Sequence, residues 1–460
     1  MTDKNALIQP DKGQPALAIH LIDKTGLDDF VRSLSAPQRA ALAAQKFVAD
    51  GYGYAIVPDG DGWFVVSGVA NVASLSSWCL SKLAEVLPAG TYRLVAAEPG
   101  PALFGWVTGQ YRFERYLSAP SEEGARVLLT KDVAGIAPAL AEAAATALVR
   151  DMVNTPAEDM GPAELEGLAS QVAKAHGAEL KVTKGDALEQ GFPMVHMVGR
   201  AAAREAAPRL IELTWGNPAH PKVALVGKGV CFDSGGLDIK PSSGMLLMKK
   251  DMGGAAHALA LAQLVMQAKL KVRLHLLIPA VENAISGNAF RPGDVLRSRA
   301  GLSVEIGNTD AEGRLVLGDA LTRAGEETPE LVIDFATLTG AARVALGPDL
   351  PAMFARRDET ADELLKAGEA ADDRCWRLPL FDGYREYLKS DIADLNNAGG
   401  NGFAGASVAA LFLDKFVPEG VDWAHFDTFA WRPAAKPGRP KGGDALGLRA
   451  AWGLLKGRYG

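Results

Sequence analysis

The segment "IGNTDAEGRL" at 306–315 brings two carboxylates and a guanidinium together directly after an apolar stretch. Asp310, Glu312 and Arg314 are spaced two residues apart, with Gly313 between the last two. Carboxylates this close repel each other, and each raises the pKa of its neighbour. The spacing therefore predicts that something positively charged faces them.

Other charged residues follow strand-like segments elsewhere in the chain. Lys228 and Asp233 come after "KVALV", Lys240 lies in "LDIKPSSG", and Asp251 lies in "MKKDMGG" at the start of a Gly/Ala-rich helix. In an open α/β sheet, ligands gather at the carboxyl ends of the strands, so the fold can bring these residues together. Three aspartates and a glutamate that converge need cations, and two divalent metal ions would offset them.

Each of these residues also has an ordinary structural interpretation. Asp251 can cap a helix N-terminus. Asp310 and Glu312 can stabilise a helix through its dipole. Lys228 and Lys240 can be solvated loop lysines. Taken one at a time, the residues favour these roles.

Two further patterns point to other chemistry and are rejected. "CFDSGGL" at 231–237 is typical of a serine nucleophile, but it ends a strand in an alternating α/β pattern, and no local signature supplies the histidine of a triad. The histidines form no metal-binding motif. His257, His275 and His425 are expected to pack in the core.

Bulk properties limit the class of protein. A net charge of −7 and a pI near 5.6 argue against broad binding to nucleic acid or anionic membranes. Three widely spaced cysteines indicate a reducing compartment. The N-terminus does not read as a secretory signal, and apolar runs such as 272–281 are too short to span a bilayer. We expect a cytoplasmic protein.

The elements that must position the charged residues form two α/β regions. Residues 1–135 read as a small N-terminal α/β domain. Residues 136–156 form an Ala-rich connecting helix that ends where Pro156 removes a donor. Strands and helices alternate over 157–460, which predicts a larger α/β domain with a mixed, mostly parallel central sheet flanked by helices. The Pro/Lys-rich segment 432–447 reads as an exposed loop.

From about Asp151 onward, the chain resembles the leucyl aminopeptidases, the dinuclear metallo-exopeptidases that include bacterial aminopeptidases A and B. "NTDAEGRL" is the family signature. Five further blocks occur in the family's order: "NTPAEDMGPAEL", "VGKGVCFDSGGLDIKPSSGMLLMKKDMGGAA", "ENAISGNAFRPGDVL", "DFATLTGAARVALG" and "WRLPL". "CFDSGG" and "ENAISGNAF" look closer to the B branch.

The resemblance implies a role for each matching residue. The metal-ligand positions are Lys228, Asp233, Asp251, Asp310 and Glu312, with Asp233 and Glu312 shared between two metal ions, Zn²⁺ and/or Mn²⁺. Lys240 is the catalytic lysine that contacts the developing oxyanion, and Arg314 holds a bicarbonate ion. The substrate pocket is lined by Met248, Asn308, Thr337, Leu338 and Gly340.

The activity implied is removal of the N-terminal residue, Leu-like by preference, from short peptides. A hydroxide activated by two metals attacks the carbonyl, with bicarbonate as general base. The family assembles as a homohexamer, a dimer of trimers whose sites face an inner cavity. The competing interpretations are another two-metal hydrolase such as a phosphatase, a DNA-binding role, or a catalytically inactive structural hexamer.

Overall fold

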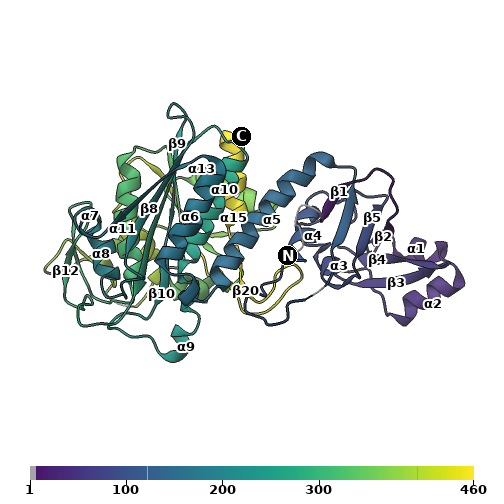
Figure 1. Ribbon diagram of the computed structural model, residues 1–460, viewed down its shortest axis with the longest axis horizontal. Coiled ribbons are helices and arrows are strands. Elements are labelled where there is room, and N and C mark those ends of the chain that lie inside the picture. The colour runs from purple at the N-terminus through teal and green to yellow at the C-terminus, as the bar shows by residue number, and fades with distance from the viewer. Residues whose placement is uncertain (1–6, 122, 401) are drawn as a thin grey trace. The chain divides into compact units, whose positions relative to one another are not determined.

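The computed structural model describes residues 7–121, 123–400 and 402–460 (Figure 1). The chain divides into two compact units. The first comprises the residues up to Ala147 together with Ala434–Lys441, and the second comprises Leu148–Pro433 and Gly442–Gly460.

The first unit is built on a six-stranded sheet in the order β1-β6-β5-β2-β4-β3. Neighbouring strands are parallel except β3 and β4, which are antiparallel. The strands are β1 (Ile8–Pro10), β2 (Leu17–Ile22), β3 (Tyr54–Asp59), β4 (Gly62–Gly68), β5 (Gly90–Val95) and β6 (Arg126–Thr130). The helices are α1 (Leu27–Ser33), α2 (Ala36–Ala44), α3 (Ser81–Val86) and α4 (Ala102–Thr108). This unit confirms the small N-terminal α/β domain.

Buried aromatic side chains organise the core of the first unit. The rings of Tyr92 and Trp106 meet edge to face with their centroids 5.8 Å apart. Both side chains are fully buried, and the Trp106 indole donates to the carbonyl of Arg126 at 2.9 Å. The segment 434–441 belongs to this unit, where the Gly438 amide donates to Glu85 Oε1 at 2.7 Å. Residues 433–436 are exposed as expected, but Gly438 and residues 442–444 are buried, so the expectation of an exposed loop is wrong for those residues.

Helix α5 (Val133–Asn154) continues the chain from the first unit into the second. Within the part of the chain that the structure describes, α5 is the one helix that is long and apolar enough, by length and composition, to cross a membrane. No such segment was predicted from the sequence, because only short apolar runs were considered. The last turns of α5 nevertheless pack inside the second unit. Arg150 is fully buried and donates twice to Asp444, at 2.9 and 3.0 Å. An arginine is fully buried almost only when it is paired, as Arg150 is here.

The second unit is built on a nine-stranded mixed sheet in the order β16-β15-β18-β14-β9-β11-β8-β7, with β10 paired to β11. Strands β18, β14, β9 and β11 are mutually parallel, and antiparallel pairings occur towards both edges. The predicted mixed, mostly parallel sheet is confirmed. The strands are β7 (Glu179–Lys184), β8 (Arg209–Trp215), β9 (Lys222–Gly227), β10 (Gly229–Asp233), β11 (Arg273–Asn283), β14 (Leu331–Ala336), β15 (Ala352–Ala355), β16 (Trp376–Arg377) and β18 (Asp422–Asp427).

Helices cover both faces of this sheet (Figure 1). Helices α6 and α15 both pack against α10 on one face, while α8 and α11 contact each other on the other. The α-helices of this unit are α6 (Pro162–His176), α7 (Asp186–Gly191), α8 (Pro193–Gly199), α9 (Ser242–Met245), α10 (Gly253–Gln267), α11 (Glu312–Glu326), α12 (Gly340–Leu346), α13 (Asp358–Ala370), α14 (Gly405–Asp414) and α15 (Leu448–Tyr459). Every residue of β14 and β18 is buried, as expected for parallel strands covered on both sides.

Short elements complete the second unit. Two small sheets are formed by β12 (Val295–Arg297), β13 (Ser303–Glu305) and β17 (Leu395–Asn396), and by β19 (Trp431–Arg432) and β20 (Gly442–Gly443). The 3-10 helices are η2 (Ala157–Asp159), η3 (Met248–Met252) and η4 (Asp382–Leu388).

Candidate active site

The carboxyl ends of the central strands carry the predicted site residues. Lys228 follows β9, and Asp233 is the last residue of β10; both strands pair with β11. The β10–β11 register is irregular between Val230 and Phe232. Because a bulge changes which way the following side chains point, it can aim Asp233 into the site.

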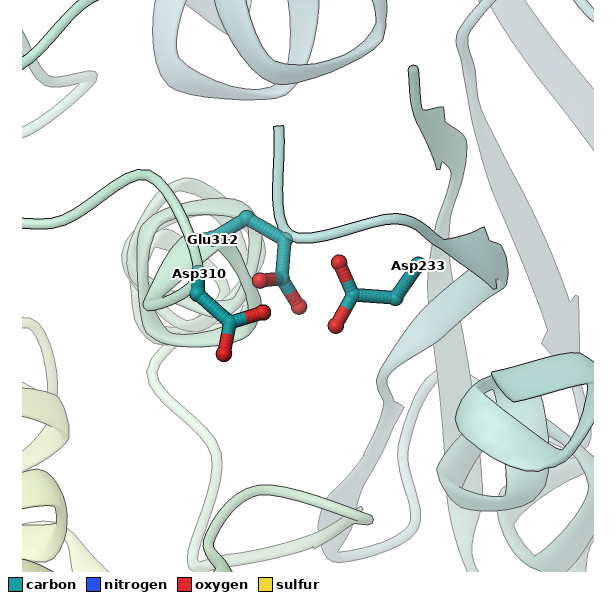
Figure 2. A group of neighbouring side chains, drawn as sticks. All are labelled: Asp233, Asp310 and Glu312. Carbon is teal, nitrogen blue, oxygen red and sulfur yellow. The ribbon is translucent and has the colours of Figure 1, made fainter. Parts of the chain in front are cut away.

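Three carboxylates face one another at this edge (Figure 2). Asp233 comes from the strand, Asp310 from the loop before α11, and Glu312 from the first residue of α11. One oxygen from each lies within 4.8 Å of the others. Three carboxylate oxygens this close form a donor set for hard divalent cations.

Lys228 lies between a second pair of carboxylates. Its Nζ is 2.5 Å from Asp251 Oδ2 and 2.9 Å from Glu312 Oε1. Gly313 makes room for it, because a Cβ there would lie 2.7 Å from Lys228 Nζ. Burial lowers the pKa of Lys228, but the surrounding carboxylates outweigh burial and raise it overall.

Lys240 reaches the same cluster from a loop. Its Nζ is 2.9 Å from Asp233 Oδ2 and also contacts Asp310. Burial opposes its charge, yet the two carboxylates raise its pKa above the ordinary lysine value. The ammonium is therefore charged at neutral pH.

Crowding and burial change the acidity of the carboxyl groups. Burial, followed by the charge of Asp233, raises the pKa of Glu312 to about 8. The same two causes raise the pKa of Asp310 to about 6. For Asp251, burial acts in the same direction, but Lys228 and Lys250 outweigh it and lower the pKa to about 2.

Asp251 does not cap a helix. Helix α10 begins after Met252 without a side-chain cap. The Asp251 carboxylate instead accepts a hydrogen bond from the Thr337 hydroxyl at 2.7 Å. The capping interpretation of this residue is therefore wrong.

Arg314 is buried at the edge of the cluster. Its Nη1 donates to the carbonyl of Asn397 at 2.5 Å, while its buried Nε has no hydrogen-bond partner. Burial lowers the pKa of Arg314 to about 10, so the guanidinium remains charged at neutral pH. A charged group with an unused donor is suited to holding an anion.

One cavity of about 530 Å³ joins these groups. Every site residue predicted from the sequence lines it, including the predicted substrate contacts Met248, Asn308, Thr337, Leu338 and Gly340.

Three polar residues that hold the site in place were not predicted from the sequence. Asn283, at the end of β11, donates to Asp233 Oδ1 at 2.9 Å. Asp427, at the end of β18, accepts from the amides of Leu338 and Thr339 at 3.0 and 3.1 Å. Asn397 is the third. Asn283 and Asp427 end strand-like segments, and that position was the signal available in the sequence.

The histidines expected to pack in the core, and the serine rejected as a nucleophile, make contacts that hold the fold together. His257 contacts the Gly253 carbonyl and accepts from the Leu446 amide. His425 lies 2.6 Å from Asp334. Ser234 donates to the Asn283 carbonyl at 2.7 Å and is therefore engaged in holding the backbone.

A buried, carboxylate-rich cluster with a lysine, beside an arginine and at the carboxyl end of an α/β sheet, is typical of a two-metal hydrolase. The chain matches the model of the cytosol aminopeptidase family catalytic domain over residues 147–451 and that of the M17 aminopeptidase N-terminal domain over 17–130. It belongs to the cytosol aminopeptidase family.

The chain is also similar to individual members of this family. A probable cytosol aminopeptidase of Syntrophotalea carbinolica is 42% identical over 369 residues, which cover 76% of this chain and 73% of the relative. The crystal structure of the cytosol aminopeptidase from Coxiella burnetii is similar with a TM-score of 0.93 and 46% identity, covering 99% of this chain and 100% of the other.

Two further solved structures are similar over nearly the whole chain. The bottromycin maturation enzyme BotP in complex with Mn has a TM-score of 0.87 and 32% identity, with 98% and 99% of the two chains covered. A mutant of tomato leucine aminopeptidase has a TM-score of 0.82 and 28% identity, with 97% and 95% of the two chains covered. The chain is a hydrolase of the leucyl aminopeptidase type, a metal-dependent exopeptidase that acts at peptide N-termini.

The raised pKa values predict that metal affinity depends on pH. The pKa values of Glu312 and Asp310 are raised to about 8 and about 6, so a cation that binds these carboxylates would displace protons from them at lower pH. We expect Mn²⁺ affinity to rise between about pH 6 and about pH 8, by up to roughly tenfold per pH unit for each carboxyl proton displaced, and loss of a proton from Lys228 would continue the rise above pH 8. Calorimetric titration of metal-free protein in buffers of different ionisation enthalpy measures both affinity and proton release. Affinity that is flat across this range would contradict the expectation.

Proposed function

We propose that Lys228, Asp233, Asp251, Asp310 and Glu312 hold two divalent metal ions, Zn²⁺ and/or Mn²⁺. The observation that supports this is the set of three carboxylate oxygens within 4.8 Å, flanked by a lysine whose Nζ reaches both Asp251 and Glu312. Asp233 and Glu312 would be the ligands shared between the two ions. Lys228 would bind as a neutral amine, a form that adjacent metal charge favours.

Metal ions bound there would polarise the scissile carbonyl and lower the pKa of water. The residues of the chain supply the remaining parts of the reaction. The Lys240 ammonium stabilises the negative charge that develops on the carbonyl oxygen. Thr337 keeps Asp251 oriented, since its hydroxyl donates to that carboxylate.

Arg314 holds a bicarbonate ion. The support for this is its buried, charged guanidinium, which lines the cavity and has an Nε donor without a partner. Bicarbonate at this position would act as general base towards water.

The substrates are short peptides with an apolar, Leu-like N-terminal residue. Met248 and Leu338 supply apolar surface in the cavity, and Asn308, Thr337 and Gly340 complete its lining. A cavity of this size excludes a folded chain and admits an extended N-terminus.

The first test measures release of p-nitroaniline from leucine p-nitroanilide. We expect activity in the isolated protein, loss after chelation, and recovery with Mn²⁺ or Zn²⁺. Lys240→Ala should keep its metal content but lose about 10²–10³-fold in kcat, because it removes stabilisation of the oxyanion. Glu312→Gln should lose metal as well. A panel of N-terminal residues measures the preference, and no activity with any metal or residue would overturn the proposal.

A second test addresses the anion. In buffer depleted of carbon dioxide, added bicarbonate should raise wild-type kcat, whereas Arg314→Ala should be slower by about 10²-fold or more and should not respond. Arg374→Ala is the matched control, because Arg374 is exposed and pairs with Glu369 at 2.6 Å. An Arg314→Ala variant that responds like wild type would rule out this role.

We also propose a homohexamer, arranged as a dimer of trimers, in the cytoplasm. Exposed apolar side chains on the second unit support self-association: Leu237, Ile239 and Leu246 are 42%, 60% and 79% exposed. Sedimentation should give six times the chain mass of 48.4 kDa, and cell fractionation should place the chain with cytoplasmic markers. A monomer at working concentration would contradict the assembly.

A further inference from the structure

Asn397 is a fully buried polar residue directly after β17, outside every predicted ligand position. Strand β17 runs parallel to β13, and the Asn397 amide donates to the Glu305 carbonyl at 3.0 Å. This register fixes Asn397 beside the segment 307–311, which connects β13 to α11 and carries Asp310.

Both ends of the Asn397 side chain bind that segment. Its Oδ1 accepts from the amides of Gly307 and Asn308 at 2.8 and 3.2 Å. Its Nδ2 donates to the carbonyls of Asn308 and Ala311 at 2.8 and 3.3 Å. Two backbone donors on one side and two backbone acceptors on the other fix the orientation of the amide.

The segment 307–311 and the segment 396–398 approach each other closely. A Cβ on residue 307 would lie 2.6 Å from Asn396 Oδ1 and 2.8 Å from Ala398 Cβ, so glycine is needed at this position. An aspartate in place of Asn397 would keep the acceptor contacts but lose both donations, and alanine would lose all four.

The same residue also contacts the arginine on the other side of the segment. The Asn397 carbonyl accepts from Arg314 Nη1 at 2.5 Å. Asp310 and Arg314 lie on either side of Glu312, yet this one residue lies against both the segment that carries Asp310 and the guanidinium of Arg314.

We propose that Asn397 is a positioning residue. It holds Asp310 in place for cation binding and Arg314 in place for anion binding, at a fixed position relative to each other. The proposal rests on the function proposed above. It assigns to a residue that touches neither ion the task of holding both binding groups: its side chain holds the segment that carries Asp310, and its main-chain carbonyl holds Arg314.

The test is Mn²⁺ binding by calorimetry to metal-free wild type, Asn397→Ala and Asn397→Asp. We expect one of the two Mn²⁺ ions to bind about 10–100-fold more weakly in both variants, the range typical when a partner of a ligand is lost. The kcat for leucine p-nitroanilide should fall by a similar factor at limiting Mn²⁺, and excess Mn²⁺ should restore part of it, while KM changes little. Rescue by metal separates positioning from a general loss of structure.

Asn396→Ala is the matched control. Asn396 is the neighbouring residue of the same type, and its side chain bonds Glu305 and the Ala398 amide rather than the backbone of 307–311. We expect it to bind both Mn²⁺ ions as wild type does. If Asn397→Ala does not fold, Asn397→Asp carries the test, since it keeps the volume and two acceptor contacts.

The outcomes separate the two proposals. Wild type that binds no Mn²⁺ would overturn the metal site itself. Wild type that binds two ions, with both Asn397 variants indistinguishable from it, would overturn only the role of Asn397. A loss of kcat that excess Mn²⁺ does not restore, with metal affinity unchanged, would also overturn it.

Discussion

Three buried carboxylates at one edge of a sheet are the constraint on which the second unit depends. Asp233, Asp251 and Glu312 are each no more than 2% exposed. Burying an unpaired carboxylate costs several kcal/mol, so each must meet a cation or a donor. Lys228 and Lys240 supply that charge in the protein alone, and metal ions supply more of it when bound. The strand ends, the bulge in β10 and the start of α11 all serve to keep these groups within reach of one another.

Uncharged side chains then fix where the charges point. Asn283 holds Asp233 through a donor, and Thr337 holds Asp251. These partners come from different strand ends, so an error in one strand's register would misplace several of them at once. Parallel pairing across β18, β14, β9 and β11 is therefore needed for the chemistry as well as for the core.

Local patterns in the sequence predicted much of this. Strand-like runs followed by charged residues indicated the carboxyl edge, and the charged motif at 306–315 indicated that positive charge would face it, which Lys228 and Lys240 supply. Asn283 and Asn397 were not predicted, because their partners lie about 26 to 90 positions away and no periodicity records such contacts. The packing of 434–441 in the first unit likewise depends on contacts between residues far apart in the sequence. A segment rich in proline and lysine reads as exposed until its partners, here Glu85 among them, are known.

The geometry of α11 explains why an acid and a base stand two residues apart in the opening motif. In an α-helix, residues i and i+2 are not neighbours on one face of the helix and do not form a side-chain pair. Glu312 therefore turns to Lys228 and the carboxylate cluster, while Arg314 turns to the carbonyl of Asn397. Had the two been four residues apart, they would neutralise each other on one face. The spacing of two keeps a carboxylate available for cations and a guanidinium available for an anion within one helical turn, and both face the same cavity.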